Sequence, residues 1–362
     1  MKILVVGGAG FVGSNLAVHF ARQGYDVAVM DNLVRRGSEF NLSRLANEGI
    51  VFRHGDARCV EDWKGLKADV VLDTAAQPAT TAGYGNPRYD ITNNTFAVLN
   101  TLEFCRDQDA GLVFWSTNKV YSCQAVHDQN IREWDERFDS EWDITEECSV
   151  DGADRSIYGT SKIMADLMIQ EFADAFQMPA VVNRCSCLAG PWQWGMADQG
   201  WVAWWVIAHV LGIPLNYIGF GGKQVRDVLF IDDLCNLVQR QVEMLAPGAR
   251  VFNVGGGRKL AMSLIECTNY MHEILGVSVP ITSVPPRRAD FSCYISNISK
   301  VSQTYDWYPD VGLRDGLEKI AAWVKKNESM IASLIPPGTA TVAPESSIFT
   351  RQRWRNGTKC DG

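Results

Sequence analysis

Short continuous apolar runs alternate with amphipathic stretches along the first half of the chain. A run that is apolar at every position is typical of a parallel strand buried on both faces, whereas apolar residues at helical spacing indicate a helix packed on the sheet. Strands are predicted over 2–7, 26–30, 50–54, 68–73, 111–115 and 180–183, and helices over 14–23, 86–107 and 162–172. This alternation predicts an α/β fold built on a Rossmann-type doubly wound parallel sheet.

The first predicted strand leads straight into a glycine-rich turn and a helix. Gly7 suits the tight turn, Gly10 lets the backbone approach a pyrophosphate, and Gly13 allows the helix to pack closely on the strand. Phe11 and Val12 lie at the start of this helix, where backbone N–H groups bind anions. The turn therefore predicts a dinucleotide-binding site.

The second predicted strand ends in Asp31 and Asn32. A carboxylate at this place accepts hydrogen bonds from the adenosine ribose hydroxyls and repels a 2′-phosphate, so that NAD is preferred over NADP. Arg35 and Arg36 follow closely and argue the other way, since a nearby arginine can hold a 2′-phosphate. We give more weight to Asp31 and predict NAD.

Further residues at the carboxyl ends of the predicted strands are candidates for contact with the same cofactor. A plain turn at Asp56 and plain packing of the alanines explain them nearly as well. The candidates are Asp56, Ala57, Ala75, Ala76, Gln77 and Ser116.

Tyr158 and Lys162 are four residues apart at the start of a predicted helix, so both side chains leave the same face. An ammonium group beside a phenol favours the phenolate, which would bring the tyrosine toward use as a general base near neutral pH. Such a pair alone is common by chance on a surface helix. Thr117, which follows Ser116 at the end of a predicted strand, and the glycine-rich turn favour catalysis.

Composition excludes several classes of function. With 46% hydrophobic and 21% charged residues, a net charge of −8 and a pI near 5.2, the chain has the profile of a globular protein without a basic stripe for nucleic acid or an anionic membrane surface. Its ten cysteines include no C-x-x-C pair, which argues against a metal site or a disulfide framework. No apolar run reaches spanning length and Met1 leads directly into a strand, so we expect a cytoplasmic protein.

The pattern changes in the second half of the chain. We expect residues 1–185 to form the dinucleotide-binding domain with Thr117, Tyr158 and Lys162, and residues 186–330 to form mainly a smaller α/β substrate-binding region from which the chain returns to the first domain. Residues 331–362 are predicted to be a mobile or surface-draped tail, since Pro, Ser, Thr and Gly dominate the last part.

Polar residues of this second half are candidates for substrate contacts. Trp192 and Trp194 stand in or beside loops and could stack on a base, although core packing is the alternative. Lys223 and Arg226 lie in a glycine-rich turn and suit a diphosphate. The acidic segment 122–155 is either a partly ordered surface excursion or a cover for the site.

Together these motifs resemble the extended short-chain dehydrogenase/reductases that act on nucleotide sugars. The resemblance covers residues 1 to about 328 and rests on Gly7-x-x-Gly10-x-x-Gly13, Asp31, Thr117, Tyr158-x-x-x-Lys162 and the stretch 224–233. The phrases at 31–37, 116–121, 198–201 and 222–229 look most like the 2-epimerases of CDP-linked hexoses such as CDP-paratose.

The resemblance implies a bound NAD that is regenerated at each turnover, and inversion at C2 of a CDP-hexose through a 2-keto sugar. Tyr158 would take the proton of the C2 hydroxyl, Lys162 would hold Tyr158 and the nicotinamide ribose, and Thr117 would bind the reacting oxygen. A homo-oligomer, dimer or tetramer, is implied as well. The substrate-binding residues are expected to be Thr81, Asn118, Cys187, Gln193, Gln199, Lys223, Gln224, Arg226, Arg287 and Asp290.

Some positions depart from the family pattern. Asn118 and Lys119 stand where the related 4,6-dehydratases carry Asp-Glu, so elimination of water lacks its acid and base. Cys187 replaces an asparagine that usually contacts the substrate phosphate, Ala189 replaces an aromatic residue and Ile157 replaces a proline, which bears on sugar specificity. Alternatives are a 4-epimerase, a sulfoquinovose-synthase-like enzyme, or a non-catalytic module that binds NAD or a nucleotide sugar.

Overall fold

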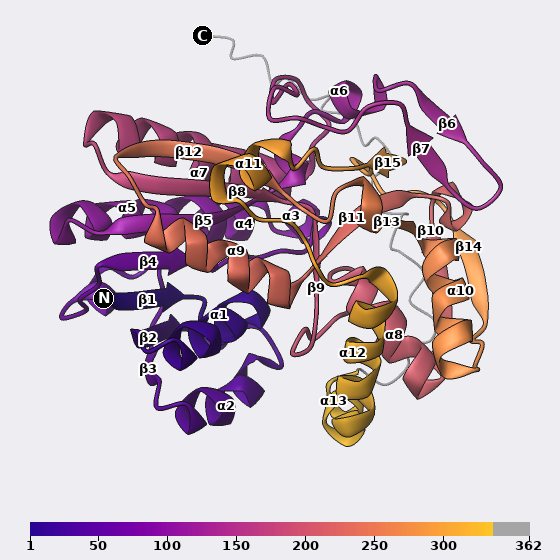
Figure 1. The fold of residues 1–362 in the computed structure, drawn as a ribbon, viewed down its shortest axis with the longest axis horizontal. Helices are drawn as coiled ribbons and strands as arrows, with labels where there is room; N and C mark the ends of the chain where they lie inside the picture. Colours follow the sequence, from indigo (N-terminus) through magenta and orange to yellow (C-terminus); the bar gives the residue numbers. More distant parts are fainter. Residues whose placement is uncertain (336–362) are drawn as a thin grey trace, which may run out of the picture.

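Seven parallel strands form the central sheet, as the sequence predicts (Figure 1). Their order is β12 (Gly248–Val254), β8 (Pro179–Cys185), β5 (Gly111–Thr117), β4 (Val70–Asp73), β1 (Lys2–Val6), β2 (Asp26–Asp31) and β3 (Val51–His54). The order reverses between β1 and β4, and ligands bind at such a point in open α/β sheets. The prediction of a Rossmann-type sheet is confirmed. The computed structural model describes residues 1–335.

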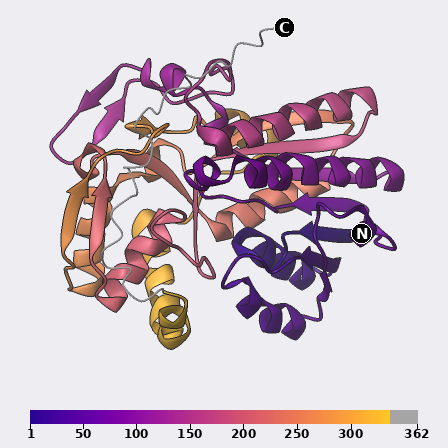
Figure 2. The ribbon, with the colours of Figure 1, turned by 180° about the vertical axis from the view of Figure 1, so that it is seen from behind.

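Alternate residues of β1 enter two separate cores, because successive side chains of a strand point to opposite faces. Ile3 and Val5 pack with α1 (Phe11–Arg22), α9 (Ile231–Glu243) and α11 (Ser299–Tyr305). Leu4 and Val6 face the core lined by α5 (Ala97–Gln108) and α7 (Ser156–Ala175) (Figure 2). The sheet is thus covered by helices on both faces.

The predicted helix over 86–107 is divided. It consists of α4 (Pro87–Ile91), a π-helical turn at Thr92–Phe96 and α5. Short helices α2 (Asn41–Asn47), α3 (Ala82–Gly85) and α6 (Cys123–His127) complete the first half with the hairpin of β6 (Ile131–Glu133) and β7 (Phe138–Ser140).

The second half builds a smaller region beside the carboxyl ends of the strands (Figure 1). Its strands form one sheet in the order β13 (Ala261–Ser263), β11 (Val225–Phe230), β15 (Cys293–Tyr294), with β9 (Cys187–Ala189) also on β11, and a pair of β10 (Leu215–Ile218) and β14 (Ile281–Val284). Its helices α8 (Trp201–Leu211), α10 (Leu264–Leu275), α12 (Leu313–Lys326) and α13 (Glu328–Leu334) share an aromatic-rich core.

The predicted start of the tail, residue 331, falls inside a helix. Ile331 is buried in the core of the second region, inside α13, because its apolar side chain continues the packing of the preceding helix. The remainder, 336–362, lies outside the described residues.

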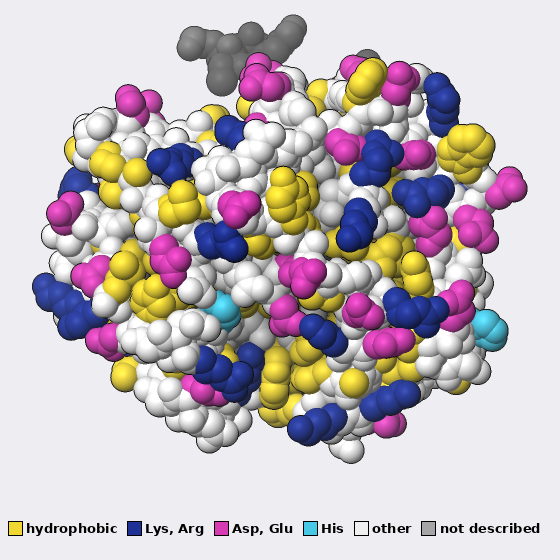
Figure 3. Space-filling view, viewed as in Figure 1, with side chains coloured by type: hydrophobic (Ala, Val, Ile, Leu, Met, Phe, Trp, Pro, Cys, Tyr) yellow, Lys and Arg dark blue, Asp and Glu magenta, His cyan; other side chains and the backbone are white. Residues whose placement is uncertain are grey.

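Four properties of the described residues bear on function: surface charge, disulfide bonds, metal sites and membrane-spanning helices. Basic and acidic side chains are interspersed on the face shown in Figure 3. All nine cysteines among the described residues are free thiols, and no group of three or more metal-ligating side chains occurs there. Within residues 1–335, no helix has the length and apolar character to cross a bilayer.

A buried ion pair fixes α7 on the sheet. Asp166 of α7 accepts from Arg184 of β8 at both carboxylate oxygens, with Arg184 Nε 3.0 Å from Asp166 Oδ2 and Nη2 3.1 Å from Oδ1. Ser116 of β5 donates to the same carboxylate at 2.7 Å. One helix and two strands therefore meet at one side chain that is inaccessible to solvent.

We expect Asp166→Asn to lower the free energy of unfolding by about 3–5 kcal/mol, because the buried Arg184 loses its counter-charge. Urea denaturation followed by circular dichroism measures the loss. Asp174→Asn on an exposed position of the same helix is the control and should change stability by less than about 0.5 kcal/mol. Equal effects of the two substitutions would contradict the assignment.

Candidate active site

A cavity of about 2000 Å³ opens where the carboxyl ends of β4, β5 and β8 face the second region. Pockets for one small ligand usually measure about 300–1,000 Å³, so this cavity has room for two ligands side by side. Its wall includes Phe11 and Val12 from α1, Ser116 from β5, and Arg226 from β11. Both halves of the chain thus contribute to one site.

The glycine-rich turn meets the requirements of a dinucleotide site. Gly7 has φ of +73°, and a Cβ atom there would lie 2.7 Å from the backbone of Ala75. A Cβ atom at Gly13 would lie 2.4 Å from the carbonyl oxygen of Gly7. No side chain caps α1 at Gly10, so the N–H groups of its first turn remain suited to a pyrophosphate.

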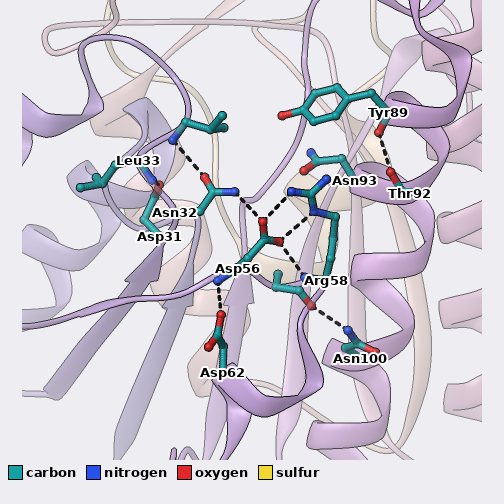
Figure 4. A network of polar contacts seen from close by, with 12 residues as sticks. Asp31, Asn32, Leu33, Asp56, Arg58, Asp62, Tyr89, Thr92, Asn93 and Asn100 are labelled. Atoms are coloured by element: carbon teal, nitrogen blue, oxygen red, sulfur yellow. Dashed lines mark hydrogen bonds and ion pairs between the residues drawn. The ribbon is translucent and has the colours of Figure 1, made fainter.

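Asp31 supports this turn from the end of β2 (Figure 4). Its carboxylate accepts from the backbone N–H groups of Ala9 at 3.0 Å and Leu33 at 2.8 Å. Burial raises the pKa of Asp31, and these hydrogen bonds oppose the rise. Each oxygen retains acceptor capacity for a ribose hydroxyl.

Asp56, one of the candidates for contact with the cofactor, is engaged by neighbouring residues of the protein (Figure 4). Its Oδ1 accepts from the backbone N–H and Nε of Arg58, both at 2.9 Å, and its Oδ2 accepts from Nη2 of Arg58 at 2.6 Å and from Asn32 at 3.1 Å. The hydrogen bonds from Arg58 hold the pKa of Asp56 well below its usual range. With two donors on each oxygen, Asp56 has no acceptor left for an adenine amino group.

The two arginines that argued for NADP are engaged elsewhere. Arg35 donates to Gln199, and Arg36 Nη2 lies 2.6 Å from the carbonyl oxygen of Ser333. Both partners belong to the second region, so neither guanidinium group is directed to a ribose 2′-position. This arrangement fits NAD.

The other expected cofactor residues divide into two groups. Ala76 and Ser116 line the cavity, and Ala75 closes on Gly7. Gln77 instead donates to Asp90 at 2.7 Å, and the carbonyl oxygen of Ala57 accepts from Trp63 and Asn100, so that these two residues hold loops together.

Thr117, Tyr158 and Lys162 all line the cavity, and all three are buried. Burial raises the pKa of Tyr158 to about 12, partly opposed by a hydrogen bond with Thr117. Burial also lowers the pKa of Lys162 to about 8, and its Nζ lies 4.1 Å from the centroid of the Phe114 ring. The sequence predicts that Lys162 lowers the pKa of Tyr158. In the protein without cofactor the pKa is raised instead, because burial of the phenol has a larger effect than its polar neighbours.

Most of the expected substrate residues face the same cavity. Those that line it are Thr81, Asn118, Cys187, Gln193, Gln199, Gln224, Arg226, Arg287 and Asp290. Lys223 does not line the cavity and pairs with Glu133 at 2.8 Å on the surface. Lys119, Arg288 and Asn216 also line the cavity, and of these Asn216 carries no signal in the sequence.

The sequence left two interpretations open for each of two further features, and the structure favours the one without a substrate contact. Trp192 and Trp194 pack on Trp323, with ring centroids 5.9 and 5.3 Å away, and do not line the cavity. None of the residues 122–155 lines it either, so this acidic segment does not cover the site. The sequence carries no signal for Trp323 as their partner, since it lies more than 100 positions away.

Comparisons with known proteins agree with this geometry. The model of the family described as "NAD dependent epimerase/dehydratase family" matches residues 3–255. The CDP-paratose 2-epimerase of Salmonella typhi is 33% identical over 339 residues, which are 89% of this chain and 99% of that protein.

Solved structures show the same fold. A UDP-glucose 4-epimerase of Thermotoga maritima with UDP-glucose is 25% identical, with a TM-score of 0.74 over 91% of this chain and 100% of that one. A dTDP-glucose 4,6-dehydratase of Bacillus anthracis in complex with NAD is 26% identical, with a TM-score of 0.76 over 92% and 100%. The cofactor of this chain is accordingly NAD.

Tyr158 should remain a neutral phenol up to about pH 11 in the NAD-free protein, because its pKa is raised above the usual 10. The measurement is absorbance at 295 nm during a pH titration, taken as wild type minus Tyr158→Phe. The difference should stay flat from pH 8 to pH 10.5. A step centred below pH 10 would contradict the raised pKa.

Arg287→Met should weaken binding of a nucleoside diphosphate about tenfold, the size expected for one charge-assisted hydrogen bond. Isothermal titration calorimetry with CDP measures it. Lys223→Met is the matched control and should leave the dissociation constant within about twofold, because Lys223 lies outside the cavity. If Lys223→Met weakens CDP binding more than Arg287→Met does, Lys223 contacts the diphosphate, as the sequence predicts.

Proposed function

We propose that this chain, which belongs to the NAD-dependent epimerase/dehydratase family, inverts C2 of a CDP-linked hexose, as in the conversion of CDP-paratose to CDP-tyvelose. The family makes it an NAD-dependent isomerase. The observation that carries the proposal is that Thr117, Tyr158 and Lys162 line the same cavity as the cations Arg226 and Arg287. The 33% identity to a CDP-paratose 2-epimerase over nearly both full lengths favours C2 and CDP.

The protein's own residues divide the work. Tyr158 accepts the proton of the C2 hydroxyl, and Thr117 binds the oxygen from which that proton leaves. Lys162, held close to Asp73 and Asp166, keeps a positive charge near the phenol during this transfer. NAD, held at the glycine-rich turn, would supply a hydride acceptor and a positive ring whose charge would favour the tyrosinate form of Tyr158.

The opposite wall anchors the nucleotide. Arg226 and Arg287 hold the diphosphate, while the sugar turns within the remaining space so that the hydride returns to its other face. A dimer or tetramer is proposed from the family resemblance alone.

Elimination of water is disfavoured by the charges in the cavity. Dehydration needs a carboxylic acid that can protonate the leaving hydroxyl. Among the described residues, Asp198 and Asp290 are the carboxylates that line the cavity. Burial would raise the pKa of Asp290, but Lys119 and Arg226 outweigh burial and hold it below its usual range, so Asp290 stays ionised.

The test follows CDP-, UDP- and GDP-hexoses by NMR in D₂O with purified protein. We expect inversion at C2 of a CDP-hexose with no deuterium gained at C2, because the same hydrogen returns. Inversion at C4 would assign the chain to the 4-epimerases, and deuterium at C5 would indicate elimination. Inertness with every sugar would favour a binding module.

Tyr158→Phe in the same assay should retain bound NAD and lower kcat by about 10²–10⁴, the usual contribution of a general base. Tyr308→Phe, at a side chain that is 66% exposed and remote from the cavity lining, is the control. Full activity of Tyr158→Phe would refute its role.

A further inference from the structure

Lys119 is a cation with 12% of its side chain exposed, and the proposed reaction assigns it no role. It follows Thr117 and Asn118 at the end of β5, and its backbone N–H donates to the Thr117 hydroxyl at 3.2 Å. Its side chain crosses to the second region, where Nζ lies 3.0 Å from the carbonyl oxygen of Ala289 and 3.2 Å from Asp290 Oδ1. The ammonium group also lies 3.9 Å from the centroid of the Phe291 ring.

Asp290 receives a second cation from another strand. Arg226 Nη2 lies 2.7 Å from the same Oδ1, and the backbone N–H of Phe291 lies 3.0 Å from it. Arg226 also donates to the carbonyl oxygen of Phe291 at 2.6 Å. One carboxylate oxygen therefore joins the end of β5, strand β11 and the loop 285–291.

Lys119 also touches the catalytic helix through its backbone. A Cβ atom added to Gly159 would lie 2.3 Å from the carbonyl oxygen of Lys119, so glycine is required for this contact. Gly159 is the residue after Tyr158. A single residue therefore contacts the helix that carries the proton acceptor and the loop that carries Arg287.

We propose that Lys119 is a positioning residue whose ion pair with Asp290 sets the distance between the nucleotide anchor and Tyr158. The inference rests on the proposed function. Arg226 and Arg287 bind the diphosphate, and the loop 285–291 moves as a unit with the end of β5 because Lys119 ties them together. Without this tie the nucleotide still binds, but the sugar carbon is presented to Tyr158 in a wider range of positions.

Lys119→Met keeps the length of the side chain and removes its charge. Asp290 retains Arg226 and the Phe291 N–H in this variant, so no buried charge is left without a partner. We expect kcat to fall about tenfold or more while KM, NAD content and the dissociation constant of CDP change less than about threefold. Lys119→Arg should recover most of kcat, and Lys259→Met, at an exposed lysine outside the cavity, should match wild type.

Hydrogen exchange supplies a readout that does not depend on turnover. Backbone amides of 285–292 should exchange about tenfold faster in Lys119→Met, and similarly in Asp290→Asn, with no further increase when both are combined. Unchanged exchange in Lys119→Met would overturn the proposal. Equal losses of kcat, CDP binding and thermal stability would also overturn it, in favour of a merely structural role.

The two proposals fail in different ways. If wild type inverts no CDP-hexose, the proposed function fails, while the exchange rates still decide whether Lys119 ties the loop to β5. If Lys119→Met does not fold, Asp290→Asn tests the same link from the other side, because it weakens the ion pair while leaving both cations in place.

Discussion

The site depends on the buried ion pair between Asp166 and Arg184. Tyr158 and Lys162 stand on the first turns of α7, so their position is set by how that helix lies on β5 and β8. Apolar packing alone holds a helix on a sheet but tolerates sliding, because it has no direction. The bidentate pairing of Asp166 with Arg184, together with the hydroxyl of Ser116, adds directional contacts to both strands.

The same burial that fixes the position also sets the electrostatics. Desolvation raises the pKa of Tyr158 to about 12 and lowers that of Lys162 to about 8, so near neutral pH the phenol is neutral and Lys162 is still mostly charged. A buried phenol of this kind is a poor base until positive charge lies beside it. Under the proposed function, proton abstraction by Tyr158 is thereby coupled to the presence of NAD, without which the sugar cannot be oxidised.

The sequence allowed the sheet and the glycine-rich turn to be predicted, because both follow from local pattern: apolar runs for strands, and glycines at positions where a Cβ atom would collide. The failures lie in long-range pairings. Nothing near Lys223 in sequence shows that Glu133 binds it, and nothing near Trp194 shows that Trp323 packs on it. The hydrogen bonds that occupy Asp56 come from Arg58, a residue that no motif of the sequence singles out.

Under the proposed function, Thr117, Tyr158 and Lys162 do not select the carbon, because they would take the proton of whichever sugar hydroxyl lies beside them. The matches to a 2-epimerase, a 4-epimerase and a 4,6-dehydratase with one fold make the same point. In the proposed function, the carbon is selected by the distance between Arg226 and Arg287, which would hold the diphosphate, and the phenol of Tyr158. In this chain that distance is bounded by Arg226 and Arg287 on one side and by the end of β5 on the other, with Lys119 between them. A sugar held by its diphosphate places one particular carbon next to Tyr158. Which carbon that is depends on the distance between the diphosphate site and the phenol, so the proposed specificity is set by this distance and not by the reacting groups.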